Sequence, residues 1–415
     1  MSHFITNINI KKVRHLQNIE ILISKNEKKH LILTGKNGSG KTSVLKAITR
    51  YLESIENKDV RKVKNYSNEL QRLEKELLKD PTDYDTIMEH KRLQDDYNYY
   101  CSELQLDIYD EANLENLYDQ GEFILAYFDA KRNPSIEIPN SVPKIKLNTS
   151  YKITENIGNV FLKYLVYLKT QQSFARNEND EQVVQRIEKW FDNFENALKN
   201  LFEDESIKLI FEYKNLNFKI SQNHREDYGF DVLSDGYSAV LDIVMNLILR
   251  MEDEKRNCYD LEGIVIIDEV ETHLHIELQK KIMPFLTSFF PNIQFIVSTH
   301  SPFVLNSIDN SVIYDLEKNL RVENLSGYAY DGIVESYFDV DKYSNTIKEK
   351  MDKYEKLIKK ETKTEDEILQ VAKLRENFNT IPKDLAPELV YKFKGIELLR
   401  KAKSISKKNR GEGND

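Results

Sequence analysis

The sequence is short of several features that would place it in a special class of protein. Only two cysteines occur among its 415 residues, and the spacing of Cys101 and Cys258 matches no metal-binding or redox motif. No window approaches the roughly 18 uninterrupted apolar residues of a membrane span, and the N-terminus lacks an apolar stretch followed by a cleavage site. These absences predict a cytoplasmic protein with two ordinary thiols in a reducing compartment.

An excess of basic residues is also missing. The chain carries 60 Lys and Arg against 69 Asp and Glu, which gives a formal net charge of -9. Because nucleic-acid backbones are bound by clustered Lys and Arg, this balance argues against a protein that coats nucleic acid indiscriminately. The basic runs at 60–64 and 401–410 are typical of a solvated surface, and local binding of nucleic acid stays open.

What is present is the composition of a soluble globular protein, with 40% apolar and 31% charged residues. Polar residues alternate with β-branched residues at 3–10 and 19–23, which predicts two strands. The apolar run 31–34 predicts a third strand, and it leads into a glycine-rich loop and a helix that starts near Gly40. The length predicts one large domain or two interleaved domains.

Two charged, helix-favouring stretches follow between 60 and 106, separated by a turn at 80–83. We expect an inserted helical hairpin, either a short antiparallel coiled coil or a plain pair of surface helices. The apolar seam of such a coiled coil would contain Leu70, Leu73 and Leu77 on the first arm and Met88, Leu93 and Leu104, together with tyrosines, on the second.

The remainder of the chain predicts an α/β fold with a mixed β-sheet and flanking helices. A buried strand is expected at 122–130, and the near-continuous apolar runs at 264–268 and 294–299 predict strands that are buried on both faces. The expected domains are a core at 1–325 that contains the hairpin at 60–106, a helical subdomain at 151–205, and a helical C-terminal region with a polar tail at 326–415.

Residues 35–42, GKNGSGKT, match the pattern GxxxxGK[ST] between a predicted strand and a predicted helix. The glycines let backbone N–H groups turn toward phosphate oxygens, and the helix N-terminus adds partial positive charge. Lys41 would reach the β- and γ-phosphates of ATP, and the Thr42 hydroxyl would bind Mg²⁺. The nucleotide-binding residues expected here are Gly35, Asn37, Gly38, Ser39, Gly40, Lys41, Thr42 and Ser43.

An apolar strand at 264–268 delivers two adjacent carboxylates to its C-terminal end. Asp268 would hold Mg²⁺, and Glu269 would polarise the attacking water as a general base. The next buried strand ends in His300, within the segment STHSP, where a side chain could sense the γ-phosphate. We therefore predict Glu269 and His300 as catalytic residues, and Thr42 with Asp268 as the metal ligands.

The segment LSDGYS at 233–238 opens a helix with a hydroxyl and a glycine, a composition that favours a backbone anion site. In the order P-loop, LSDGYSA, IVIIDEVETHLH and STHSP, the chain resembles the ABC-type ATPases, and in particular their soluble branch of SMC, RecF and OLD-like proteins. The resemblance covers about residues 1–325. The family segment usually reads LSGGQ or LSGGE, so Asp235 and Tyr237 depart from it.

The resemblance implies that Ser234 and Gly236 contact the γ-phosphate bound by a second subunit, so that two sites form on head-to-head dimerisation. It also implies that 272–275 lies where subunits meet and that Arg14 flanks the adenine. The family's glutamine, which completes Mg²⁺ coordination, has no clear counterpart here. Asp129 and Arg132 are the candidates in its place.

Within this branch the chain looks most like the compact ATPases of bacterial anti-phage systems, namely Septu, retrons with Septu-like genes, and PARIS. The phrases DEVETHLH and STHSP, and the helical region after GYAYDGIVESYFDV, are similar to theirs. We expect an ATP- and Mg²⁺-dependent regulator that holds a separately encoded nuclease of HNH or TOPRIM type. The alternative is a DNA-binding repair or recombination ATPase, and a transporter subunit or a housekeeping ATPase are further possibilities.

Overall fold

The computed structural model describes residues 3–132, 137–142, 144–252, 259–323, 325, 332–333, 345–381 and 387–411. They belong to two compact units, 1–330 and 331–415, which are described separately. Cys258, most of the segment 327–340 and the predicted polar tail after 411 lie outside the described residues. Among the helices that are described, none is long and apolar enough to cross a membrane.

The first unit is built on a six-stranded sheet with the strand order β12-β11-β3-β10-β9-β5. Five strands are parallel, and β12 at the edge pairs antiparallel with β11. The strands are β3 (His30–Thr34), β5 (Phe123–Phe128), β9 (Glu262–Ile267), β10 (Ile293–Ser298), β11 (Ser311–Asp315) and β12 (Leu320–Glu323). The predicted α/β fold with a mixed sheet and flanking helices is confirmed.

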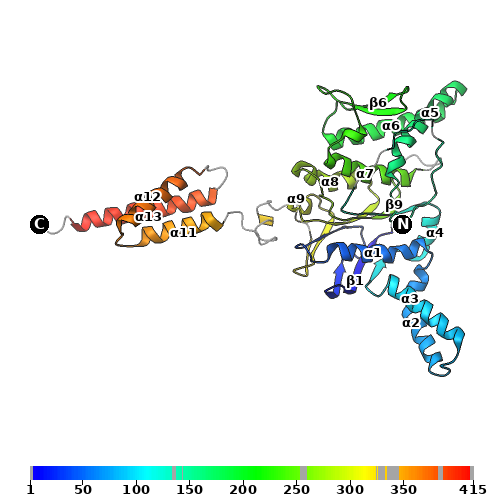
Figure 1. The fold of residues 1–415 in the computed structure, drawn as a ribbon, viewed down its shortest axis with the longest axis horizontal. Helices are drawn as coiled ribbons and strands as arrows, with labels where there is room; N and C mark the ends of the chain where they lie inside the picture. The colour runs from blue at the N-terminus through cyan, green and yellow to red at the C-terminus, as the bar shows by residue number, and fades with distance from the viewer. Residues whose placement is uncertain are drawn as a thin grey trace. The chain divides into compact units, whose positions relative to one another are not determined.

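A second, antiparallel sheet and the first helix form the core on one side of the large sheet. This sheet has the order β2-β1-β4 and consists of β1 (Ile5–Val13), β2 (Leu16–Leu22) and β4 (Leu104–Ile108). Helix α1 (Lys41–Glu56) contacts β10 of the large sheet and β1 and β4 of the small one (Figure 1). Its apolar residues recur every three to four positions and are buried, as an amphipathic helix between two apolar surfaces requires.

The insertion contains helices α2 (Val60–Leu77) and α3 (Tyr84–Tyr100), but two members of the predicted seam are placed elsewhere. Leu104 pairs with Ile10 and begins β4, where it is fully buried. The alternation in LQLDI at 104–108 has the period of a strand, and sequence reading missed it because it directly follows a helix. Met88 is 47% exposed and does not contribute to an apolar seam.

The other face of the large sheet is covered by α7 (Asp235–Met251) and α8 (Ile276–Phe289) (Figure 1). Beyond them stand α5 (Phe161–Glu178) and α6 (Glu181–Phe202), followed by a small sheet. That sheet consists of β6 (Lys208–Glu212), β7 (Asn217–Ser221) and β8 (Tyr228–Gly229), and the short helices α4 (Leu114–Asp119) and α9 (Pro302–Leu305) complete the unit.

The second unit consists of α11 (Asn345–Lys359), α12 (Glu365–Asn379) and α13 (Pro387–Gly411). A capping box between Thr364 and Glu367 fixes the start of α12. The three helices share a separate apolar core, whose members include Met351, Tyr354, Phe378, Phe393 and Ile396.

Candidate functional site

The glycine-rich loop at 35–42 joins β3 to α1 and depends on left-handed backbone conformations. Gly35, Gly38 and Gly40 have φ angles of +132°, +84° and +100°, which side-chain-bearing residues rarely adopt. At Gly40, a Cβ atom would also lie only 2.9 Å from the Cδ1 atom of Leu16. The loop shape therefore favours glycine at all three positions because of backbone geometry, and at Gly40 because of space as well.

The polar groups of this loop fit a polyphosphate. Lys41 is 6% exposed, and its Nζ donates to the carbonyl oxygens of Gly35 at 2.8 Å and Lys36 at 3.2 Å. The Oγ atom of Ser39 is buried and has no hydrogen-bond partner in the described structure. A buried ammonium group, an unpaired hydroxyl and a helix N-terminus together provide donors for an anion that carries several charges.

Strand order brings the other predicted catalytic groups to the same edge. Because β3, β10, β9 and β5 are parallel, their carboxyl ends share one edge of the sheet. Burial lowers the pKa of Lys41, and the carboxylates of Glu269, Glu271, Asp268 and Asp315 act in the opposite direction. The lysine therefore lies within electrostatic reach of the acidic pair predicted from the sequence.

The acidic pair is held by Ser298, the last residue of the neighbouring strand β10. The Oγ atom of Ser298 donates to Oδ1 of Asp268 at 2.5 Å and accepts from the backbone N–H of Glu269 at 2.7 Å. Asp268 is 1% exposed, whereas Glu269 is half-buried. Sequence reasoning assigned no role to Ser298, since nothing local shows which carboxylate a strand-end hydroxyl will contact.

His300 lies between the P-loop and the acidic pair, because β10 is hydrogen-bonded to both β3 and β9. Burial lowers the pKa of His300, and the Lys41 ammonium lowers it further. Its backbone N–H donates to Oε1 of Glu271, whose Oε2 atom is buried without a partner in the described structure. The site therefore contains a third carboxylate, Glu271, for which the sequence suggested no role.

The two residues suggested to complete Mg²⁺ coordination differ in what the structure allows. Arg132 is 6% exposed, and its guanidinium donates to the backbone carbonyls of Asp268 at 2.9 Å and Glu269 at 2.8 Å. A guanidinium has no acceptor atom, so Arg132 cannot be a metal ligand and that suggestion is wrong. Asp129 is exposed, and its Oδ1 accepts from the N–H of Ala130.

Arg14 lies at the turn between β1 and β2, with a positive φ of 53° and an exposed side chain. This turn lies beside the start of α1, since a Cβ at Gly40 would meet His15 at 3.7 Å as well as Leu16. The structure thus places Arg14 in a turn that packs against the P-loop.

The segment 233–238 packs against the loop that follows the acidic pair. A Cβ atom at Gly236 would lie 2.9 Å from the carbonyl oxygen of His273, so this close approach requires glycine. Ser234 is the exposed N-cap residue of α7, and its side chain makes no hydrogen bond to its own helix. The ring of Tyr237 stacks on Phe202 of α6 with the centroids 4.2 Å apart.

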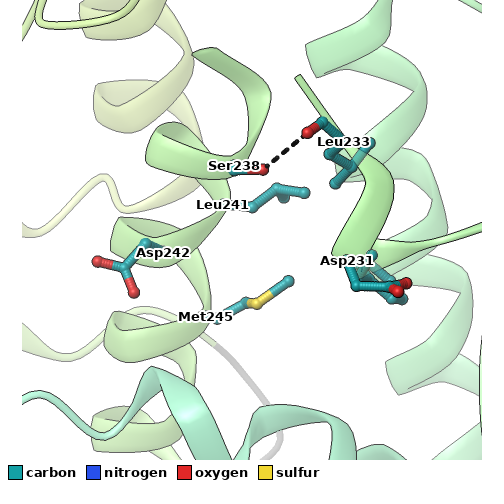
Figure 2. Close-up of a pocket in the computed structure, with 7 residues that line it drawn as sticks. Asp231, Leu233, Ser238, Leu241, Asp242 and Met245 are labelled. Carbon is teal, nitrogen blue, oxygen red and sulfur yellow. Dashed lines mark hydrogen bonds between the residues drawn. The ribbon is translucent and has the colours of Figure 1, made fainter. Parts of the chain in front are cut away.

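A cavity of about 110 Å³ lies behind this segment. Figure 2 shows it between α7 and the stretch 230–233, where the Ser238 hydroxyl donates to the carbonyl of Leu233 at 3.4 Å.

The β11–β12 hairpin supports the P-loop from the other side. Oδ1 of Asp315 accepts from two N–H groups in the hairpin turn, those of Glu317 at 2.8 Å and Lys318 at 3.0 Å. The exposed pair of Lys36 and Glu317, 2.8 Å apart, joins this turn to the P-loop. The turn is therefore tied both to its own strand and to the loop at the site.

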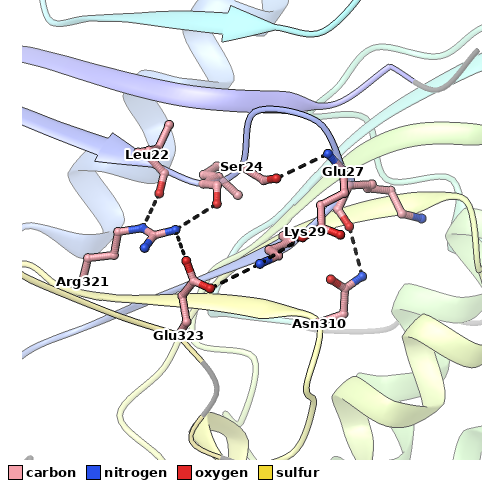
Figure 3. A network of polar contacts seen from close by, with 9 residues as sticks. Leu22, Ser24, Glu27, Lys29, Asn310, Arg321 and Glu323 are labelled. Atoms are coloured by element: carbon pink, nitrogen blue, oxygen red, sulfur yellow. Dashed lines mark hydrogen bonds and ion pairs between the residues drawn. The ribbon is translucent and has the colours of Figure 1, made fainter.

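Polar contacts at the far end of this hairpin join the two sheets (Figure 3). Arg321 of β12 donates to the carbonyls of Leu22 at 2.6 Å and Ile23 at 3.2 Å, and it pairs with Glu323. Glu323 also pairs with Lys29 at 3.3 Å, just before β3. These contacts therefore link the start of β3, the strand that leads into the P-loop, through β12 to the end of β2 in the small sheet.

Comparisons with known proteins show what this chain is similar to. Residues 31–306 match the family model described as "AAA domain, putative AbiEii toxin, Type IV TA system". The Septu protein PtuA of Bacillus mycoides (strain KBAB4) is 27% identical over 391 residues, which are 90% of this chain and 50% of that protein. The Retron Vc95 probable ATPase of Vibrio cholerae serotype O1 biovar El Tor is 23% identical, over 71% of this chain and 70% of that protein.

This chain therefore spans half the length of the Septu relative. Among solved structures, the SmcHead bound to the C-winged helix domain of ScpA aligns with a TM-score of 0.39 at 12% identity, over 77% of this chain and 96% of that chain. The resemblance to Septu and retron ATPases drawn from the sequence is confirmed. Since the family model spans the chain from β3 to α9 and includes every motif at the sheet edge except Arg14, this protein belongs to that AAA-domain family of P-loop ATPases.

Proposed function

We propose that this protein is a Mg²⁺-dependent ATPase whose nucleotide sites are each shared between two copies of the chain. The observation that carries the proposal is the convergence of Lys41, the acidic pair and His300 at one edge of the sheet. A P-loop alone supports binding, whereas a P-loop facing carboxylates and a histidine supports hydrolysis.

The residues of one chain divide into binding and chemical roles. The backbone of 35–42 and the Lys41 ammonium would hold the phosphates, while the Thr42 hydroxyl and the Asp268 carboxylate would hold Mg²⁺, which neutralises phosphate charge. Glu269 would accept the proton of the attacking water, and His300 would contact the γ-phosphate. Arg14 would lie beside the nucleotide base.

The segment 233–238 at the start of α7 supports a shared site. Ser234 lies at the N-cap position of α7, and its hydroxyl makes no hydrogen bond to that helix. Both Ser234 and Asp235 are exposed. Exposed donors at a helix N-terminus are suited to a phosphate brought by another molecule. We therefore infer a head-to-head dimer, or a higher even-numbered assembly, in which Ser234 and Gly236 of one copy contact the γ-phosphate held by the other.

The biological role that we propose is anti-phage defence. Its support is that the curated relatives are Septu and retron proteins, and that one of them is named a probable ATPase. In this proposal the ATPase controls a separately encoded effector nuclease, which docks on the second unit or on the α2–α3 hairpin. ATP binding or hydrolysis by the dimer then sets whether the nuclease is held or released.

Two substitutions test the ATPase. Lys41→Ala should abolish ATP binding, with Lys46→Ala as the control, since Lys46 is an exposed lysine on the same helix. Glu269→Gln should keep ATP binding, lower turnover on the order of a hundredfold or more, and accumulate the dimer. Full ATP affinity in Lys41→Ala, or unchanged turnover in Glu269→Gln, would contradict the assignments.

The defence role is tested by co-purification with the products of adjacent genes, followed by a nuclease assay with and without ATP. We expect a co-purifying protein whose nuclease activity changes with ATP and does not change when the Lys41→Ala variant is used. Strong, salt-sensitive stimulation of ATP turnover by DNA without any such partner would instead support a repair ATPase.

A further inference from the structure

Arg132 lies directly beneath the loop that carries the acidic pair. It follows β5, the edge strand that pairs with β9, and its guanidinium donates to the backbone carbonyls of Asp268 at 2.9 Å, Glu269 at 2.8 Å and Val270 at 3.4 Å. Three successive carbonyls thus point at one buried cation. Hydrogen bonds from a charged donor are among the stronger ones in proteins, so this contact fixes the path of the loop backbone.

The backbone of Glu269 adopts an unfavourable conformation that such contacts can stabilise. Its φ angle is +44°, in the left-handed region that residues other than glycine adopt at a cost of about 1 kcal/mol or more. The Ser298 hydroxyl holds the N–H of Glu269 from one side at 2.7 Å, and Arg132 holds its carbonyl from the other. The path of the Glu269 backbone is therefore set by both contacts together, while the Thr272 hydroxyl donates to Oε2 of its carboxylate at 3.2 Å.

Carboxylates oppose the cost of burying the Arg132 charge. Burial lowers the pKa of Arg132, and the carboxylate of Asp242 is the first of those that act in the opposite direction. Asp242 lies on α7, is 4% exposed, and accepts from Nδ2 of Asn156 at 3.5 Å. Its carboxylate is turned away from Asp231 across the helix (Figure 2).

We propose that Arg132 is a positioning residue for the general base. Its guanidinium holds the backbone carbonyls of 268–270 and, together with Ser298, keeps the Glu269 backbone in the conformation that its carboxylate needs to reach the attacking water. This inference rests on the proposed ATPase function and names a residue on which its general base depends.

The chain offers a closely matched control. Arg250 lies on α7 and is 5% exposed. Its guanidinium donates to the carbonyls of Leu125 at 2.8 Å, Tyr151 at 3.2 Å and Lys152 at 3.0 Å. Arg250 is as deeply buried as Arg132 and also donates to several backbone carbonyls, but those carbonyls lie outside the acidic-pair loop. A purely structural role for Arg132 predicts that the two arginines respond alike.

The test compares Arg132→Lys with Arg250→Lys in the full chain. Lysine keeps the charge but loses the planar fork that serves several carbonyls. We expect ATP affinity and ATP-driven dimer formation to stay within about twofold of wild type in both variants. Turnover at saturating ATP should fall by roughly 10- to 100-fold in Arg132→Lys only, the range seen when a residue that orients a reactive group is lost.

Equal turnover of the two variants, after correction for the folded fraction, would overturn the inference. Arg132→Gln provides a second variant, because its amide can still donate to a carbonyl but carries no charge. We expect its turnover to fall at least as far as that of Arg132→Lys while ATP affinity is kept. A loss of ATP affinity that matches the loss of turnover would show a general loss of structure and would also overturn the inference.

Failure of the proposed function gives a different result. If wild-type turnover is absent or is unaffected by Lys41→Ala, the ATPase assignment fails and the positioning role of Arg132 fails with it. If wild-type turnover depends on Lys41 but Arg132→Lys turns over like Arg250→Lys, only the positioning role is wrong.

Discussion

Replacing Ser298 by alanine should weaken both the fold and the catalytic site. Ser298 is fully buried at the end of β10, and its single Oγ atom serves both members of the acidic pair. The substitution removes a bond to the Asp268 carboxylate, worth about 1.5–3 kcal/mol, and leaves the half-buried N–H of Glu269 unpaired, at about 1–3 kcal/mol. Because relaxation recovers part of each, we expect a net loss of about 2–4 kcal/mol in the free energy of unfolding.

The control is Ser54→Ala. Ser54 is also fully buried, but its hydroxyl donates only to the carbonyl of Tyr51 at 2.6 Å in the same helix. A neutral hydrogen bond of this kind contributes about 1 kcal/mol. Urea unfolding of both variants measures the difference, and turnover at saturating ATP shows whether the acidic pair has moved.

Ser298→Ala should unfold at a lower urea concentration than Ser54→Ala and should turn over ATP at least tenfold more slowly than wild type, whereas Ser54→Ala should keep wild-type turnover. The reasoning is refuted if the two variants unfold at the same urea concentration and hydrolyse ATP equally fast. That result would mean that the hydroxyl does not hold the acidic pair in solution.

Two further predictions concern pH and packing. Burial lowers the pKa of His30 to about 3, and its Nδ1 accepts from the N–H of Phe295 at 3.0 Å. The imidazole therefore takes up a proton near pH 6.5 in the unfolded chain but not in the native chain. For this reason the free energy of unfolding should fall as the pH drops below about 6.5. His30→Asn keeps an acceptor, and its unfolding free energy in urea should depend less on pH between about 6.5 and 4; parallel curves for the two proteins would exclude His30 as the cause. Gly236→Ala places a Cβ 2.9 Å from the carbonyl of His273 and should cost about 1–3 kcal/mol in urea unfolding. Gly395→Ala meets no atom within 4 Å and should be neutral or stabilising, so an equal loss in both would contradict the packing argument.

Local patterns in the sequence predicted the elements that hold the site. The loop 35–42 could be recognised because its glycine spacing and its position between a strand and a helix are encoded within a dozen residues. The buried strands β9 and β10 were predicted for a similar reason, since a continuous apolar run needs no knowledge of its neighbours. Residues 104–108 were misread because a short alternating run next to a helix can be assigned to either element.

The contacts between these elements could not be predicted in the same way. Ser298 and Asp268 lie 30 residues apart, and Arg132 and Asp268 lie 136 residues apart. Their meeting depends on the strand order β10-β9-β5, which no periodicity in the sequence encodes. For this reason the sequence could suggest Arg132 as a metal-site residue, whereas the fold shows its guanidinium bonded to the backbone of the acidic pair.

By itself, then, the sequence determined that a phosphate-binding loop and an acidic strand end are present, because both are local arrangements of residue types with one chemical use. Only the tertiary structure decided what holds them. Parallel strands bring distant residues to one edge of the sheet, and there a buried serine and a buried arginine become the supports of Glu269. Such supports act through hydrogen bonds across strands, and those bonds exist only once the sheet has formed.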